Sequence, residues 1–242
     1  MFSSAVEGQT KSERTRALLR EIALRSFREE GYDATTIRRI AAEAGVSVGT
    51  TNYHFASKSL LVQELYLDVQ QRHRAAAMPA LDGVDDLIDR LAVVYRTGLD
   101  QLAPYHAHAG EFLAAAVAPR SEINPLSAES APAREITEEL FAAAVRGARH
   151  RLPGDIVATL PSALFLGHLL LALFWVYDRS PGQERTRRLL DRGLTLLGTT
   201  LPLVRLPLVR PLVRDLLSLI AEVRVHPADA LALSNPARAA EK

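Results

Sequence analysis

Residues 36–58 read TIRRIAAEAGVSVGTTNYHFASK, and this stretch decides the fold. Apolar residues at helical spacing predict a short helix that ends at Gly45, because glycine permits a left-handed turn. Ser47 can then cap a second short helix at about 48–54. Two short helices joined by a tight turn are the arrangement of a helix-turn-helix, which we place at 36–55.

The second of these helices is poor in apolar side chains. Residues 49–52, which read Gly-Thr-Thr-Asn, stand where a core helix would have leucine or isoleucine. A helix that buries so little requires another partner, and the major groove of DNA fits it, because small polar side chains can reach base edges there. The expected DNA contacts are Thr36, Arg38, Ser47, Val48, Gly49, Thr50, Thr51, Asn52, Tyr53, His54 and Lys58.

Lys58 begins the next helix, where its charge and the free N–H groups of the first turn both favour a phosphate. Taken one at a time, the residues also suit an exposed turn without a ligand, in which Tyr53 and Phe55 are core aromatics. Together and in this order they favour binding to double-stranded DNA. Residues 11–74 carry 11 Lys and Arg against 8 Asp and Glu, a mild indication in the same direction.

A longer set of residues around this stretch forms one specific motif. Its members are Phe27, Gly31, Tyr32, Thr35, Thr36, Ile37, Ile40, Ala41, Ala44, Gly45, Val46, Ser47, Gly49, Thr50, Tyr53, His54, Phe55, Ser57, Lys58 and Leu61. The motif resembles the DNA-binding domain of the TetR (tetracycline repressor) family of bacterial regulators. The chain departs from the family's usual leucine, apolar and aromatic residues at Ser26, Thr51 and Asn52, respectively. The resemblance implies a homodimer, a C-terminal domain that responds to a ligand and, usually, repression.

Helical periodicity dominates the chain and strand-like alternation is nearly absent, so the expected fold class is all-α. The expected helices are 11–30, 37–44, 48–54, 58–78, 84–103, 105–118, 134–151, 161–178, 184–201 and 211–225. We expect an N-terminal three-helix helix-turn-helix DNA-binding domain at 11–72 and a larger helical effector-binding and dimerisation domain at 73–225. Residues 226–242 are expected to form a flexible tail. Closely spaced prolines in the Leu-Pro-Leu-Val-Arg repeat at 201–214 exclude a continuous helix there, and the repeat suggests no function.

Two of the C-terminal helices have the composition of a dimer interface. Residues 161–178 are apolar on every face, which predicts burial on all sides, and one small domain rarely provides that much cover. Residues 184–201 repeat leucine at helical spacing. Two such helices per subunit would form a four-helix interface by two-fold symmetry; the alternative is the core of a monomer. The residues expected in the interface are Leu164, Leu171, Leu190, Leu194 and Leu197.

The expected effector pocket lies between residues 84 and 178. Its candidate residues are Tyr95, His106, Phe112, Phe141, His168 and Trp175. They contain no cluster of like charge, which favours a small apolar or weakly polar effector. His168 also suits an ordinary core histidine. His106 and His108 point in different directions on a helix, so neither a metal site nor a cofactor is expected.

The composition excludes several other classes of protein and kinds of site. The chain of 242 residues is 48% hydrophobic and 24% charged, which excludes disorder as its overall state. It has no cysteine, so disulfides, thiolate zinc sites and cysteine nucleophiles are absent. No apolar signal sequence is seen at the N-terminus, which favours a cytoplasmic protein, and polar residues interrupt the longest uncharged run, which argues against a membrane span.

The sequence also lacks the short motifs that mark common enzymes. It has no glycine-rich phosphate loop, no Gly-x-Ser-x-Gly and no His-Glu-x-x-His, so no catalytic activity is expected. The alternatives that remain are a DNA-binding activator or a regulator without a small-molecule ligand. An enzyme or a membrane-associated helical protein is a more remote alternative.

Overall fold

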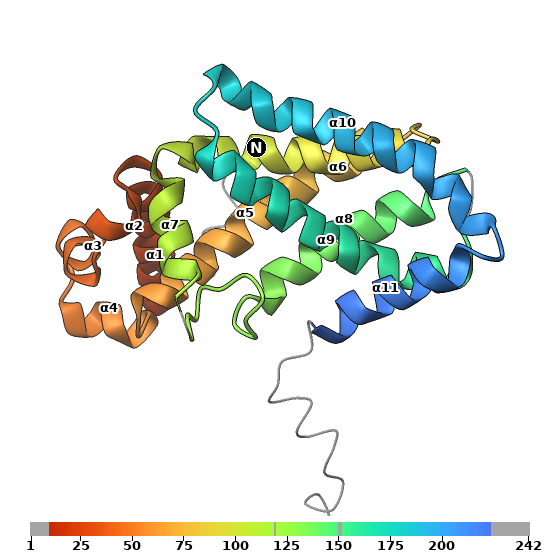
Figure 1. Ribbon diagram of the computed structural model, residues 1–242. Coiled ribbons are helices and arrows are strands. Elements are labelled where there is room, and N and C mark those ends of the chain that lie inside the picture. Colours follow the sequence, from red (N-terminus) through yellow and green to blue (C-terminus); the bar gives the residue numbers. More distant parts are fainter. Residues whose placement is uncertain (1–9, 119, 150–151, 224–242) are drawn as a thin grey trace, which may run out of the picture. The chain divides into compact units, whose positions relative to one another are not determined.

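The computed structural model describes residues 10–118, 120–149 and 152–223 (Figure 1). Every regular element in these residues is helical, which confirms the expected all-α class. The first elements are α1 (Lys11–Glu29), α2 (Gly31–Ala34), α3 (Ile37–Glu43), α4 (Val48–His54) and α5 (Lys58–Ala80). The next are α6 (Leu87–Leu102), the 3-10 helix η1 (Ala103–His108), α7 (Ala109–Ala116) and α8 (Ala131–Arg146). The last are α9 (Gly154–Tyr177), η2 (Pro181–Gln183), α10 (Glu184–Thr200), η3 (Leu201–Arg205) and α11 (Arg210–Val223).

The chain divides into two compact units. The first unit contains residues 10–71 and 100–133, and the second unit contains residues 72–99 and 134–223. The sequence analysis placed 100–133 with the C-terminal domain, whereas their packing places them with the helix-turn-helix. The expected tail at 226–242 lies outside the described residues.

The first unit is built around the inner faces of α1, α3 and α5. A capping box starts α1, in which the Thr10 hydroxyl accepts the Glu13 N–H and the Glu13 carboxylate accepts the Thr10 N–H at 2.7 Å. The apolar residues of these helices form one buried cluster with Phe27 and Phe55 near its centre. Tyr105, Ala116 and Ile123 belong to the same cluster, so η1, α7 and the following loop complete this core.

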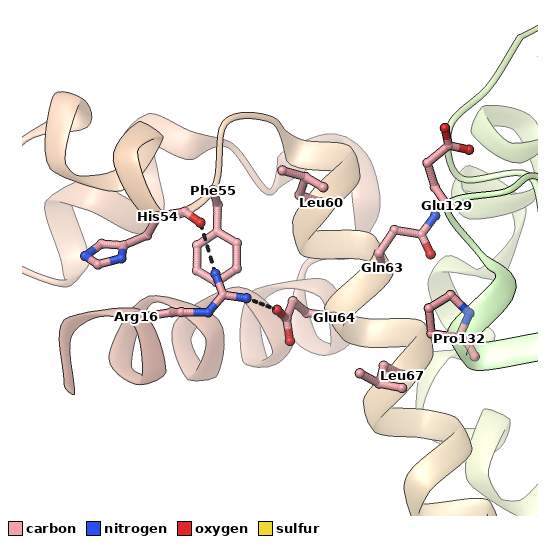
Figure 2. Close-up of a pocket in the computed structure, with 10 residues that line it drawn as sticks. Arg16, His54, Phe55, Leu60, Gln63, Glu64, Leu67, Glu129 and Pro132 are labelled. Carbon is pink, nitrogen blue, oxygen red and sulfur yellow. Dashed lines mark hydrogen bonds and ion pairs between the residues drawn. The ribbon is translucent and has the colours of Figure 1, made fainter. Parts of the chain in front are cut away.

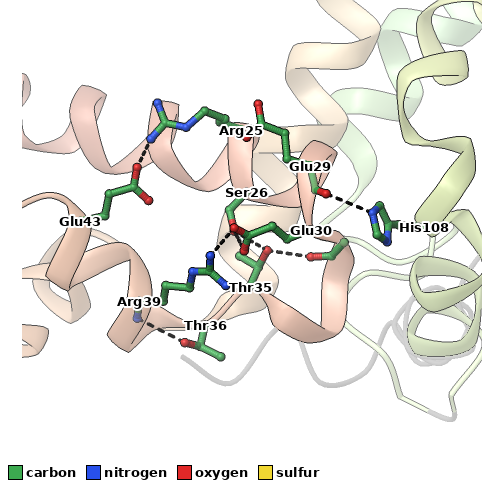
Figure 3. Close-up of polar contacts among 10 residues, drawn as sticks. Arg25, Ser26, Glu29, Glu30, Thr35, Thr36, Arg39, Glu43 and His108 are labelled. Atoms are coloured by element: carbon green, nitrogen blue, oxygen red, sulfur yellow. Dashed lines mark hydrogen bonds and ion pairs between the residues drawn. The ribbon is translucent and has the colours of Figure 1, made fainter.

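Gly31 marks the closest approach between α2 and α7. Its φ is +88°, and a Cβ built on it would lie 2.5 Å from Glu111 Oε2 and 2.5 Å from His108 Nδ1. Glu111 also accepts the N–H of Asp33 at 2.9 Å. Nδ1 of His108 lies 3.0 Å from the Glu111 carboxylate. Nε2 of His108 lies 3.3 Å from the carbonyl oxygen of Glu29 (Figure 3). Residue 31 therefore has to be glycine for conformational and for steric reasons.

Arg90 organises the second unit. It is buried, and its guanidinium donates to the carbonyls of Ala144 at 2.8 Å and Ala143 at 3.1 Å, near the end of α8. It also donates to the carbonyls of Leu81 at 3.0 Å and Val84 at 2.6 Å, just after α5. Carbonyls at the end of a helix have too few backbone donors, so one side chain supplies donors to the ends of two helices.

Asp178 holds the turn between α9 and α10. Its carboxylate accepts hydrogen bonds from the N–H and hydroxyl of Ser180, at 2.9 and 2.6 Å, and from those of Thr186, at 2.8 and 2.7 Å. Burial alone would raise the pKa of this carboxyl, but the four hydrogen bonds hold the pKa well below its usual range. The ionised carboxylate therefore fixes the conformation of the turn and the direction in which α10 begins.

Two expected helix boundaries were wrong because proline was given too much weight. We expected a helix to start at Pro161, but α9 starts at Gly154 and contains Pro161. Residues Ile156 and Leu160 of the added turns are buried, and that burial offsets the hydrogen bond that proline removes. In the same way, α5 continues past Pro79 to Ala80. The prolines of 201–214 do interrupt the helix as expected, between η3 and α11.

Helix α9 is apolar on all faces, but the single chain covers only part of it. Within the second unit it buries one face, which includes Leu164, His168 and Trp175. Among the described residues it is the one helix long and apolar enough to cross a membrane, and one such helix is weak evidence because core helices of soluble proteins pass the same test. The single chain therefore leaves part of the helix uncovered, in line with the expectation that one small domain rarely covers such a helix alone.

Candidate nucleic-acid interface

Helices α3 and α4 form the expected helix-turn-helix, with boundaries that match the prediction to within a residue. Gly45, at φ +67°, makes the turn between them. The Ser47 hydroxyl accepts the N–H of Thr50 at 3.0 Å and caps α4. Thr36 caps α3 by accepting the N–H of Arg39 at 3.2 Å. Hydroxyl caps at the two starts therefore fix both short helices, which are too short to be stable alone.

Most of the side chains of α4 point to solvent. Tyr53 is 81% exposed and Val48 is 42% exposed, and Asn52 and Gly49 are also exposed. The outward face of α4 therefore presents both polar and apolar groups to solvent, the combination that side chains use to contact base edges in the major groove.

Thr51 contradicts the prediction that it contacts DNA. It is fully buried, and its hydroxyl donates to the carbonyl of Ser47 at 3.3 Å. Its place on the inner side of α4 explains why the family usually has an apolar residue there. The structure therefore limits the candidates for base contacts to the outward residues, of which Thr50 is half-buried and Asn52 exposed.

A shallow depression joins the exposed parts of α3 and α4. It is lined by Thr36, Ile37, Arg38, Val48 and Asn52. Four of these five residues are among the expected DNA contacts, although they come from two helices. The fold thus brings together residues that are up to 16 positions apart in the sequence, from 36 to 52.

The arginines around this depression differ in whether a carboxylate neutralises them. Arg39 pairs with Glu30, and Arg25 pairs with Glu43 (Figure 3). Arg38 is exposed and has no ion pair with any residue that the structure describes. Its charge is therefore available to a phosphate, which would be one way for Arg38 to make the DNA contact expected of it.

Arg16 is a functional candidate that the sequence analysis missed. Its guanidinium donates to the carbonyl of His54 at 3.0 Å, lies 4.3 Å from the centroid of the Phe55 ring and pairs with Glu64 (Figure 2). Through these contacts α1 and α5 hold the C-terminal end of α4. A cavity of about 170 Å³ lies beside this contact, also lined by Gln63 and Pro132.

A sequence signal for this contact did exist. Arg16 and Arg20 are four residues apart on α1, and Glu64 and Asp68 have the same spacing on α5. Arg20 donates to Glu64 at 2.9 Å and to Asp68 at 3.0 Å. Opposite charges at matching helical spacing indicate that two helices lie side by side, and this pattern could have predicted the contact between α1 and α5.

The amine of Lys58 lies against an aromatic ring. Its ammonium lies 3.8 Å from the centroid of the Tyr32 ring. The pKa of Lys58 is lowered, because the effect of partial burial exceeds that of the nearby carboxylates of Asp33 and Glu111, which raise it. One ring face engages only one side of an ammonium that carries three N–H donors, so the phosphate contact of Lys58 stays a prediction.

The expected effector residues fall in two different units. Tyr95, Phe141 and His168 pack together in the second unit, where Trp175 is also buried. Phe112 instead belongs to the first unit, with its ring centroid 5.6 Å from that of Phe27 and 5.5 Å from that of Tyr32. His106 lies in the first unit as well. Phe112 and His106 therefore do not lie with the other expected effector residues, because η1 and α7 complete the core of the first unit.

The leucine stripe expected in the dimer interface faces inward. Leu164, Leu171, Leu190 and Leu194 are each 6–7% exposed within the single chain, and Leu197 is half-buried. The same spacing suits a core stripe and an interface stripe, and the prediction chose wrongly. The exposed large apolar residues of these two helices are Leu170, Leu173, Phe174 and Tyr177 of α9 and Leu189 and Leu196 of α10.

The fold and the exposed α4 together define a helix-turn-helix protein with a second helical unit. Comparisons with known proteins agree. Residues 19–65 match the family model described as bacterial regulatory proteins, tetR family, and residues 90–217 match the model described as the tetracyclin repressor-like C-terminal domain. The second match covers more than half of the chain. The chain belongs to the TetR family of bacterial transcriptional regulators.

Individual relatives are more distant. The HTH-type transcriptional repressor KstR2 of Mycobacterium tuberculosis is 33% identical over 102 residues, which are 42% of this chain and 50% of that protein. The chain thus spans about half the length of this curated relative. A TetR regulator structure from Nitrosomonas europaea aligns with 76% of this chain and 98% of its own, at TM-score 0.55 and 20% identity. One from Syntrophomonas wolfei aligns with 78% and 97%, at TM-score 0.58 and 17% identity. These two likenesses concern the fold alone.

Proposed function

We propose that this protein is a homodimeric transcriptional repressor that binds a palindromic operator and is released from it by a small, largely apolar effector. The observation that carries the proposal is α4, a capped helix whose outward face is exposed beside Arg38, an arginine with no ion pair among the described residues. Family membership supports DNA binding and regulation. The relative KstR2 is itself described as a transcriptional repressor, which favours repression over activation.

The dimer in this proposal uses the exposed apolar faces of α9 and α10. On α9 these residues recur at i, i+3, i+4 and i+7, which places them on one side of the helix. Gly193 of α10 has nothing within 4 Å of a Cβ built on it, so it leaves room for a close helix, whereas Gly198 packs inward at 3.2 Å from Ile88. Two-fold symmetry would then join two helices from each chain.

Footprinting on DNA upstream of the protein's own gene tests the proposal. A dimer should protect two half-sites whose centres lie about 34–36 Å apart or a multiple of that spacing, on a nearly palindromic sequence. If no double-stranded fragment from the native locus is retained at low salt, DNA binding is refuted. If binding occurs and deletion of the gene lowers target expression, the protein is an activator.

Replacing Arg38 with alanine should weaken binding about equally on operator and random DNA, because a phosphate contact carries no sequence information. The slope of log affinity against log salt should fall by roughly one unit for each phosphate that the variant no longer neutralises, thus by about two for a dimer. Fluorescence anisotropy over a range of salt concentrations measures this slope. Arg39→Ala is the matched control, since Arg39 is paired with Glu30 and the slope should stay unchanged. Equal slopes for the two variants would contradict the assignment.

Asn52→Ala should act on specificity. An exposed asparagine in the major groove can pair with adenine, and we expect a loss of about 1–3 kcal/mol confined to particular base pairs of each half-site. Measurement on a set of single-base operator variants locates the effect. An equal loss on operator and random DNA would refute base readout by Asn52. Arg38→Ala serves here as the comparison that weakens all sequences alike.

A further inference from the structure

Four aromatic rings meet in the interior of the second unit. They come from four helices: His73 of α5, Tyr95 of α6, Phe141 of α8 and His168 of α9. The ring centroid of His168 lies 6.3 Å from His73, 6.2 Å from Tyr95 and 6.3 Å from Phe141. The sequence analysis did not select His73, which is 1% exposed and stacks on His168 with ring planes 20° apart.

One polar atom in this cluster has no partner. The Tyr95 hydroxyl donates to the carbonyl of Leu164 at 2.9 Å, and Nε2 of His73 lies 2.9 Å from the carbonyl of Val94. His168 is 4% exposed, and its Nδ1 makes no hydrogen bond in the part of the chain that the structure describes. Buried polar atoms are paired in the large majority of cases, so this nitrogen requires an explanation.

Glycine stands at two positions next to these rings, and the rings fill the space that a side chain at either position would take. A Cβ on Gly98 would lie 3.0 Å from Cε1 of His168 and 3.1 Å from Cε1 of His73. A Cβ on Gly167 would lie 3.0 Å from the Tyr95 hydroxyl. Glycine at both positions lets these three polar rings enter the centre of the unit, where leucine or alanine would be the ordinary choice.

The charge around the cluster is low. Burial, with a smaller contribution from His73, lowers the pKa of His168 to about 3, so its imidazole is neutral at pH 7. Burial likewise lowers the pKa of His73. Arg90, the buried cation of this unit, is already used by four backbone carbonyls. A charged ligand would thus meet neutral rings in a region of low dielectric, at a high cost in desolvation.

We propose that Nδ1 of His168 is the polar contact for the effector, a neutral and largely apolar molecule that carries one hydroxyl or carbonyl group. This inference rests on the proposed function, since it assigns the ligand class to the effector-binding unit. The neutral imidazole supplies one hydrogen bond, and the flanking rings of Tyr95 and Phe141 supply apolar surface. Binding that moves these rings would act on α5, α6, α8 and α9 together, because each helix contributes one ring.

Phenol, toluene and benzoate test the three parts of this inference, because they share one ring and differ in polarity and charge. Calorimetric titration and thermal shift should detect phenol with the full-length protein, about tenfold tighter than toluene and with benzoate weakest. In His168→Phe, phenol should lose that advantage while toluene binding is kept. His106→Phe, the same substitution in the first unit, should behave like the unsubstituted protein.

A second measurement does not depend on the variant. The ¹⁵N signals of the His168 imidazole should shift on addition of phenol and not of toluene, which reports the hydrogen bond in the unsubstituted protein. Absence of binding by all three probes, equal binding of phenol and toluene, or preferred binding of benzoate would each overturn the inference. Binding of operator DNA, measured in parallel, tests the proposed function separately. The His168→Phe variant should still bind the operator. If the unsubstituted protein does not bind it, DNA binding is refuted, and the result with the three probes still stands.

Discussion

Leu170→Glu should convert the protein from a dimer into a monomer. Leu170 is 68% exposed and is the first residue of the exposed apolar face of α9, followed on the same side by Leu173, Phe174 and Tyr177. In a two-fold interface each copy of the substitution would bury an unpaired carboxylate, which costs about 3–5 kcal/mol. Since 1.4 kcal/mol corresponds to a factor of ten, the dimer should weaken by at least about 100-fold.

Loss of the dimer should also remove tight operator binding, because a monomer contacts one half-site. Light scattering at micromolar concentration measures the mass, and anisotropy measures the operator affinity on the same samples. Leu208→Glu is the matched control. Leu208 is 93% exposed, more than Leu170, but lies outside α9 and α10, so the same substitution there should leave both measurements unchanged. A dimeric Leu170→Glu variant would refute this interface.

Gly31→Ala should be the most destabilising small substitution in the first unit. A left-handed φ costs an alanine roughly 1–2 kcal/mol, and the overlap with His108 and Glu111 adds about 1–3 kcal/mol. The overlap is costly to relieve, because the added Cβ would also lie 2.7 Å from Cγ of His108, which cannot move without the whole ring. The melting temperature should fall by about 5–15 °C, at roughly 2–4 °C per kcal/mol for a chain of this size.

Gly45→Ala separates the two causes. Gly45 has a similar φ of +67°, but nothing lies within 4 Å of a Cβ built on it, so only the conformational cost should appear. The double substitution His108→Ala, Gly31→Ala should recover part of the loss relative to His108→Ala alone. Thermal unfolding followed by circular dichroism measures all four variants. Equal losses for Gly31→Ala and Gly45→Ala would show that the contact with α7 contributes nothing.

The helix-turn-helix was predictable from sequence because its signals are local. Caps at Thr36 and Ser47 and a left-handed glycine at Gly45 act within four residues of where they stand, and the structure places both helices as predicted. The shortage of apolar residues in α4 is likewise a property of seven consecutive positions. Within the two helices the prediction was wrong at Thr51, because the direction of this side chain depends on the packing of α4 against its neighbours.

The partition of the chain into units was not predictable in the same way. Residues 100–133 directly follow residues 72–99 of the second unit, yet Tyr105, Phe112 and Ile123 pack in the cluster that contains Phe27. Their apolar spacing only shows that they are buried, and nothing in it identifies the surface that covers them. For this reason the expected effector residues lie in two different units.

The sequence by itself determined the all-α class, the DNA-binding motif and the family, because helix caps, glycine turns and hydrophobic spacing act over a few residues. Only the tertiary structure decided which leucines of α9 and α10 face inward and, within the part of the chain that it describes, which arginines have no ion pair and that Nδ1 of His168 has no hydrogen-bond partner. The sequence of an α-helix that is apolar on every side does not indicate which side packs against its own chain. That choice is made by segments far apart in the sequence, when they compete to bury the same surface.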